Sequence, residues 1–357
     1  MNIHRWVSDL FGEKPLHVWG NRILFILKKR CCYSGSYGNF SSGLYNSAKF
    51  CSDMLEENGY HTKLVEVTDN NDIDREVFQF RPDVCIIEAL WVVPEKFIVL
   101  QELHPSVKWI VRIHSEAPFL SQEGIGIKWL SEYPNQNVWV GVNSLEAFEQ
   151  LMSFYPDKGI DTEKLLYLPT YYPAPDIIKT RQFSGTTINI ACMGAIRQLK
   201  NNLIQAIAAI RFADNKGYTL RFHINADIFD VEGSPTFKSL VDLFAGTKHQ
   251  LIQHNWIDHN YFLLFLGTVD IGMQVSFSET FCIVAADVVA TGTPFVGSPA
   301  IRWADEKSQA DPTSIESIVK KLHNSLDNKK LCKDNLKMLQ YYSSQAKRAW
   351  FETLEDF

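Results

Sequence analysis

The sequence lacks any long apolar segment. Charged residues interrupt the apolar runs of this 357-residue chain within about ten residues, well short of the ~20 that a membrane-spanning helix needs. The first residues, MNIHRW, also lack the apolar core of a signal peptide. We therefore expect a cytoplasmic protein without membrane insertion.

Cysteine is scarce, with seven residues and no C-x-x-C spacing. Cys85, Cys192 and Cys282 lie in apolar runs that are typical of strands or helices. An odd number of cysteines without a paired spacing argues against a disulfide framework. The sequence predicts buried, reduced thiols.

Several motifs of metal and nucleophile chemistry are absent. The chain contains no P-loop and no G-x-S-x-G, and its histidines show no metal-ligand spacing on one helix face. The D-x-D formed by Asp72 and Asp74 lies in an acidic polar stretch, residues 69–76, which we interpret as a solvated turn. No metal is expected.

The composition is that of a folded protein, with 46% hydrophobic and 21% charged residues, and the length suits two domains. A net charge of -6 implies no general attraction to polyanions. A local basic cluster, Lys28, Lys29 and Arg30, is the exception.

Short β-branched or aromatic runs alternate with helical or polar stretches in the first half. Such alternation predicts a doubly wound parallel sheet. The predicted strands are residues 22–27, 62–67, 84–87, 109–113 and 138–142, and residues 43–58 form a predicted helix that ends at Gly59.

A second α/β series follows a proline-rich connection at residues 169–175. We expect an N-terminal domain over residues 1–175, a C-terminal domain over 176–335 and a final helix over 336–357. The predicted strands of the second series are residues 187–192, 219–224, 250–253, 269–274 and 294–296.

The most informative stretch is residues 276–294, SFSETFCIVAADVVATGTP. A strand ends in small polar residues, Glu279 lies in the turn that follows, and a helix predicted over residues 281–291 carries Asp287. The N-terminus of a helix offers free backbone N–H groups to a phosphate or a sugar oxygen. Two acids in this arrangement can accept hydrogen bonds from two hydroxylated rings.

This stretch resembles the E-x7-E signature of the retaining GT-B glycosyltransferases of the family 4 type. The resemblance implies an α/β fold of two facing Rossmann-like domains with parallel sheets, and a C-terminal helix that crosses back to the first domain. It also implies that Glu279 holds the donor sugar, that Asp287 holds the nucleotide ribose in place of the usual Glu, and that Thr280, Phe281 and Cys282 supply backbone contacts.

Residues 193–201, MGAIRQLKN, directly after a predicted strand, resemble the donor diphosphate site of the same enzymes. The resemblance assigns Gly194, Arg197 and Lys200 to this site. Fixed cations stabilise the charge that a nucleoside diphosphate gains as the glycosidic bond breaks. Trp256 and Ile257 resemble the residues that cover the nucleotide base, and His114 resembles the histidine that hydrogen-bonds the donor sugar.

We therefore expect a glycosyltransferase that moves a sugar from a UDP- or GDP-sugar to an acceptor with retention of configuration. Basic and aromatic residues at the acceptor side suit phosphate contacts and base stacking, which makes a hydroxymethylated base in DNA the leading acceptor candidate. The alternatives are a saccharide or small metabolite as acceptor, or a GT-B-like sugar-nucleotide epimerase. The acceptor candidates are Lys28, Lys29, Arg30, Tyr37, Gly38 and Glu116.

Overall fold

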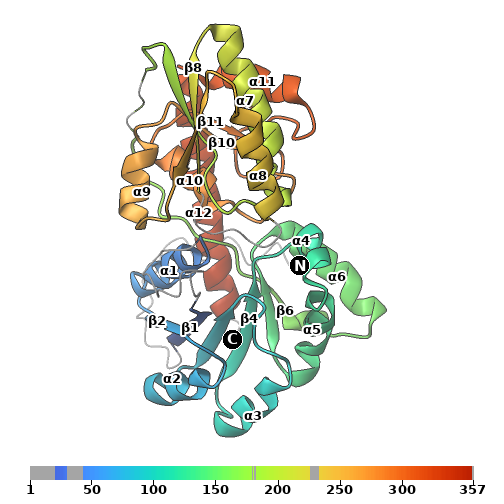
Figure 1. Ribbon diagram of the computed structural model, residues 1–357. Helices are drawn as coiled ribbons and strands as arrows, with labels where there is room; N and C mark the ends of the chain where they lie inside the picture. The colour runs from blue at the N-terminus through green and yellow to red at the C-terminus, as the bar shows by residue number, and fades with distance from the viewer. Residues whose placement is uncertain (1–20, 30–42, 179, 181, 226–232, 356–357) are drawn as a thin grey trace.

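The computed structural model describes residues 21–29, 43–178, 180, 182–225 and 233–355. These residues form two α/β domains, one above the other in Figure 1, each built around a parallel sheet. The expected architecture of two Rossmann-like domains with parallel sheets is confirmed.

The N-terminal sheet has six parallel strands in the order β2-β1-β3-β4-β5-β6. Their bounds are β1 Arg22–Lys28, β2 His61–Val67, β3 Val84–Glu88, β4 Lys108–Ile113, β5 Trp139–Val142 and β6 Leu165–Tyr167. β6 is not among the predicted strands. The apolar run LLYL that precedes Pro169 is too short to identify as a strand from the sequence.

Side chains of β1 enter two separate cores. Leu24 and Ile26 pack with helices on one face of the sheet, whereas Ile23 and Phe25 pack with helices on the other. A parallel strand buried on both faces reads as a continuous apolar run, which is why the sequence reveals it. The first face carries α2 Asp72–Phe80, α3 Lys96–Leu103, α4 Ala117–Glu123, α5 Gly126–Glu132 and α6 Leu145–Asp157, and the second carries α1 Gly43–Glu56.

The C-terminal sheet has five parallel strands in the order β11-β10-β7-β8-β9. They are β7 Thr187–Ala191, β8 Thr219–Asn225, β9 Gln250–His254, β10 Ile271–Gln274 and β11 Phe295–Gly297. One core joins this sheet to α7 Asn202–Lys216, α8 Gly233–Phe244 and α11 Ile315–Ser325, and a second joins it to α9 His259–Leu266 and α10 Ile283–Ala290.

The last helix, α12 Lys329–Glu355, spans both domains (Figure 1). Leu336 and Leu339, in its first half, pack in the core that contains α10, and Trp350, near its end, packs under the N-terminal sheet. The expected crossing-back helix is present, and it begins at Lys329, before the predicted residue 336. No helix in the described ranges is long and apolar enough to cross a membrane.

Two local expectations differ from the structure. Residues 69–71 form a turn, but Asp72 and Asp74 lie in the first turn of α2, where Asp72 accepts hydrogen bonds from the backbone N–H groups of Thr68 and Asp69. Glu279 lies in the turn before α10 as predicted, but the helix begins at Ile283 and not at residue 281. The five cysteines in the described ranges are free and buried, and they include the three named above.

Gly272 of β10 allows α10 to lie against the sheet, because a Cβ at this position would lie 2.5 Å from both Cγ atoms of Val288. We expect Gly272→Ala to lower the free energy of unfolding by about 1–3 kcal/mol, as overpacking of a core does. Urea unfolding measures this. Val288→Ala removes the two methyl groups with which the new Cβ would clash. The Gly272→Ala and Val288→Ala double variant should therefore lose less free energy of unfolding than the sum of the losses in the two single variants. A loss equal to that sum would contradict the explanation that the helix approaches the sheet closely at Gly272.

Candidate functional site at the domain interface

The segment after β7 brings a backbone N–H and two cations to the carboxyl edge of the C-terminal sheet. Gly194 has φ +104°, a conformation that favours glycine, and its N–H donates to Asn225 Oδ1 at 2.7 Å. Arg197 and Lys200 follow around a short 3-10 helix, Gln198–Lys200. The carboxyl edge of a parallel sheet is where ligands bind in such folds.

Lys200 and Glu279 form an ion pair with 2.6 Å between Nζ and Oε1. The Glu279 side chain is 8% exposed and that of Lys200 is 24% exposed. Burial disfavours the ammonium form, but the Glu279 carboxylate raises the pKa of Lys200 above its ordinary value. The two predicted donor residues, 79 positions apart in the chain, are thus direct partners.

Arg197 points across to the N-terminal domain, where its guanidinium lies 5.2 Å from the centre of the Phe119 ring of α4. Its charge also lies near Glu123, whose pKa is raised by burial and lowered in part by Arg197. The predicted diphosphate contact is therefore at the domain interface.

The loop that carries Glu279 enters α10 through a strained residue. Cys282 adopts a left-handed conformation with φ 65° and ψ 81° at the N-terminal end of this helix. Such a backbone is rare for a residue with a side chain, and strain of this kind gathers at functional sites. The carbonyl of Phe281, a predicted backbone contact, accepts a hydrogen bond from Trp303 Nε1 at 2.7 Å.

Asp287 is 1% exposed and has two partners. The Tyr172 hydroxyl donates to Asp287 Oδ1 at 2.8 Å, and His259 Nε2 lies 2.7 Å from the same oxygen. Burial raises the pKa of Asp287, and the two hydrogen bonds oppose that rise. A ribose hydroxyl would therefore have to compete with Tyr172 or His259 for this oxygen.

Trp256 and Ile257 lie between β9 and α9, at the same edge of the sheet. Trp256 is half-buried and Ile257 is 37% exposed. The two residues directly precede Asp258, the N-cap of α9, and His259 is the first residue of this helix.

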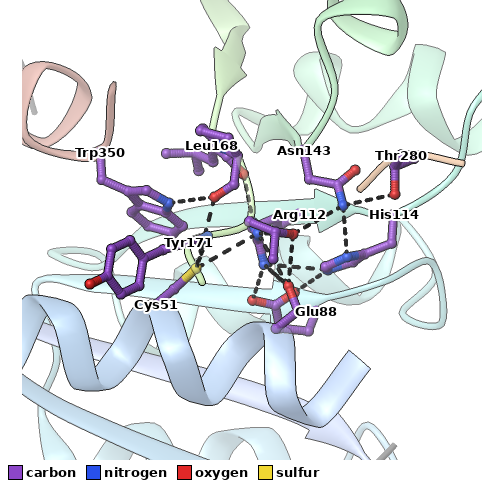
Figure 2. Close-up of polar contacts among 12 residues, drawn as sticks. Cys51, Glu88, Arg112, His114, Asn143, Leu168, Tyr171, Thr280 and Trp350 are labelled. Carbon is purple, nitrogen blue, oxygen red and sulfur yellow. Dashed lines mark hydrogen bonds and ion pairs between the residues drawn. The ribbon is translucent and has the colours of Figure 1, made fainter. Parts of the chain in front are cut away.

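A buried ion pair, Glu88 with Arg112, lies at the carboxyl edge of the N-terminal sheet (Figure 2). Both side chains are 0% exposed, and Arg112 Nη1 donates to both Glu88 oxygens, at 3.0 and 3.1 Å. Burial alone would raise the pKa of Glu88, but Arg112 and His114 hold it below its ordinary value. Arg112 Nε also donates to the Leu168 carbonyl at 2.9 Å, and its guanidinium lies 5.4 Å from the centre of the Trp350 ring.

His114 extends this pair toward the C-terminal domain (Figure 2). Its Nε2 lies 2.5 Å from Glu88, and Asn143 Nδ2 lies 3.1 Å from its Nδ1. Burial and the nearby Arg112 lower the pKa of His114, which favours the neutral ring. Because the Asn143 amide nitrogen is a donor, Nδ1 accepts from it, and a neutral ring then donates from Nε2 to Glu88. The Asn143 amide also donates to Thr280 Oγ1, beside Glu279, at 3.1 Å.

Two further contacts join the domains here. Ser278 Oγ, in the loop of Glu279, donates to Glu116 Oε2 at 3.0 Å, and Arg302, in the segment after β11, pairs with Glu146 of α6. Glu116, one of the acceptor candidates, is 7% exposed. It therefore lies directly across the interface from the predicted donor loop.

The other acceptor candidates are only partly described. Lys28 is exposed at the end of β1, and the backbone N–H of Lys29 donates to the Val67 carbonyl at 2.7 Å. Arg30, Tyr37 and Gly38 lie outside the described residues.

Sequence reasoning missed Glu88, Asn143, Tyr172 and His259. A signal existed for the first two, since each stands at the end of a buried strand, where the edge rule places ligand groups. Tyr172 and His259 reach Asp287 only through tertiary packing. In the described part of the chain, no group of three or more His, Cys, Asp or Glu side chains is arranged to hold a metal ion.

Comparisons with known proteins support the fold. No protein-family model and no curated protein sequence matches this chain. Among solved structures, the sucrose-phosphate synthase of Thermosynechococcus elongatus aligns with a TM-score of 0.66 and 13% identity, covering 94% of this chain and 98% of that one. The UDP-forming α,α-trehalose-phosphate synthase of Burkholderia xenovorans aligns with a TM-score of 0.65 and 11% identity, covering 94% of this chain and 99% of that one. Anabaena HepE in complex with UDP aligns with a TM-score of 0.58 and 11% identity, covering 94% of this chain and 100% of that one. This chain has the GT-B fold.

The Glu88–Arg112 pair gives a stability test of the N-terminal half of the site. Arg112→Met leaves the Glu88 carboxylate buried without its cation, with only the hydrogen bond to His114, and we expect a loss of about 3–5 kcal/mol in the free energy of unfolding. Glu88→Leu added to Arg112→Met should recover part of that loss. The matched control is Lys49→Met at the exposed Lys49–Asp53 pair, where the loss should stay below about 1 kcal/mol. Equal losses in the Arg112 and Lys49 variants would contradict the role of burial.

Proposed function

We propose that the chain is a retaining glycosyltransferase that moves a sugar from a UDP- or GDP-sugar to a hydroxyl group of a small acceptor. In the reaction, the bond between the anomeric carbon and the diphosphate oxygen breaks, and its electron pair leaves with the diphosphate. A bond forms between the same carbon and the acceptor oxygen, and the acceptor proton passes to the departing diphosphate.

The observation that carries the proposal is the Lys200–Glu279 pair beside Arg197, at the edge of the C-terminal sheet that faces the N-terminal domain. A nucleotide sugar offers a partner for each charge: diphosphate oxygens for the two cations, and sugar hydroxyls for the carboxylate. Cations placed at the leaving group stabilise the charge that develops there. We propose these roles for Arg197, Lys200 and Glu279.

The remaining donor contacts follow the E-x7-E resemblance. We assign the nucleotide ribose to Asp287, the base to Trp256 or Ile257, and the diphosphate to backbone groups of Thr280, Phe281 and Cys282 and to the Gly194 N–H, which would exchange its bond to Asn225 for one to the diphosphate. His114 would contact the donor sugar if the sugar replaces the Asn143 amide at its Nδ1. UDP is the first nucleotide to test, since the HepE structure of the same fold is in complex with UDP.

For the acceptor, we favour a small hydroxylated molecule over a DNA base. Structures of the same fold include a sucrose-phosphate synthase and a trehalose-phosphate synthase. On the acceptor side the described residues offer Glu116, an acid, opposite the donor loop. A carboxylate recognises a hydroxyl and repels a phosphate backbone.

The donor assignment predicts the behaviour of two variants. Lys200→Ala should weaken UDP binding at least tenfold in calorimetry, because a cation to the diphosphate is lost. Glu279→Gln should keep the fold and lower kcat by roughly 10²-fold or more, because the donor sugar is no longer positioned.

The matched control is Lys248→Ala, which removes an exposed lysine paired with Asp214 in the same domain. It should leave UDP affinity unchanged, and thermal melts confirm that all variants are folded. UDP affinity that is the same in Lys200→Ala and Lys248→Ala would refute the donor site.

A further inference from the structure

Cations are concentrated near the C-terminal end of the chain. Residues 320–348 contain eight Lys and Arg residues but only two Asp and Glu residues, in a chain whose net charge is -6. This stretch includes the end of α11 and most of α12. It is therefore strongly positive, although the chain as a whole is acidic.

One face of α12 carries a row of lysines. The helix buries a series of side chains that includes Leu336 and Leu339, whereas Lys330, Lys333 and Lys337 are exposed. Residues three or four positions apart share one face of a helix, so the three lysines lie in a row on the side opposite the buried series. At 1.5 Å per residue the row extends about 10 Å along the helix axis.

Neighbouring acids do not neutralise this row. None of the three lysine side chains makes an ion pair, a hydrogen bond or a ring contact within the described ranges. Asp334, which is half-buried, is the one acid in the sequence between Lys329 and Arg348. The Debye length at physiological salt is about 8 Å, so the fields of lysines this close together add in front of the helix.

Two large side chains with apolar surface lie beside the lysines. Met338 is 42% exposed, and Tyr341, four residues after Lys337 and on the same face of α12, is 65% exposed. The phosphates of a nucleic acid offer nothing to a methionine side chain. The boundary between lipid headgroups and acyl chains suits both a methionine and the ring of a tyrosine. Cations beside exposed apolar groups on one helix face therefore fit an anionic membrane surface.

We propose that the exposed face of α12, formed by Lys330, Lys333, Lys337, Met338 and Tyr341, binds the surface of a membrane that contains anionic phospholipids. The lysines contact the lipid phosphates, and Met338 and Tyr341 contact the headgroup region next to them. Because α12 spans both domains (Figure 1), this contact attaches the whole molecule to the surface. The inference does not depend on the proposed glycosyl transfer.

The binding test uses the full chain and co-sedimentation with vesicles. Vesicles of phosphatidylcholine with about one third phosphatidylglycerol should bind the protein at least tenfold more tightly than vesicles of phosphatidylcholine alone, because each cation near an anionic surface contributes roughly fivefold in affinity. Added sodium chloride should weaken the binding. Equal binding to the two kinds of vesicle, or binding to neither, would overturn the proposal.

The row of lysines is tested by a triple variant, Lys330→Gln, Lys333→Gln and Lys337→Gln. It should bind the anionic vesicles at least tenfold more weakly than the wild-type protein. Gln has nearly the same helix propensity as Lys, and the three positions are exposed, so α12 should be retained.

The matched control makes the same change of net charge at three exposed lysines elsewhere, Lys128→Gln on α5, Lys158→Gln after α6 and Lys248→Gln before β9. It should weaken vesicle binding less than threefold. Equal weakening by the two triple variants would mean that net charge and not α12 is responsible, and the surface assignment would be wrong.

The apolar contact and the class of partner are tested separately. Met338→Ser combined with Tyr341→Ser leaves the charge unchanged and should weaken binding to the anionic vesicles at least threefold. No weakening in this variant would refute the apolar contact. A wild-type protein that binds a duplex oligonucleotide but not the anionic vesicles would replace the membrane by a nucleic acid and overturn the proposal.

Discussion

The N-terminal half of the site depends on the buried ion pair of Glu88 and Arg112. Neither charge is exposed to water, so each needs the other and the hydrogen bonds around them. Arg112 contacts the Leu168 carbonyl and the Trp350 ring, so the pair joins β3 and β4 to the segment after β6 and to α12. Glu88 in turn fixes His114 in one orientation. The pair therefore determines which groups the N-terminal domain presents to the C-terminal domain.

Polar contacts that a ligand could replace cross the interface next to apolar packing such as that of Phe50 against Tyr172 and His259. Asn143 donates to Thr280 and Glu116 accepts from Ser278 across the interface, and Lys200 pairs with Glu279 within the C-terminal domain beside them. Hydroxyl groups, a carboxylate and an ammonium are also the groups that recognise a sugar and a diphosphate. In the proposed function, a nucleotide sugar would replace these contacts with its own.

Much of the fold was predictable, because strands buried on both faces appear in the sequence as apolar runs such as that of β1. The three-residue strand β6 was too short to recognise. In the site, Glu279 and Lys200 were identified from motifs that follow strands, and the structure brings them together. The partners of Asp287 could not be predicted, because Tyr172 belongs to the interdomain connection and its position depends on how the two domains pack.

The most direct test of the account follows the anomeric centre of the transferred sugar. The protein is incubated with α-linked UDP- and GDP-sugars and small hydroxylated acceptors, and the product is detected by mass and its anomeric proton by NMR. The account predicts a new glycoside with the α configuration of the donor, together with release of the nucleoside diphosphate. A β-linked product, or nucleotide sugars that stay intact with every acceptor, would contradict it.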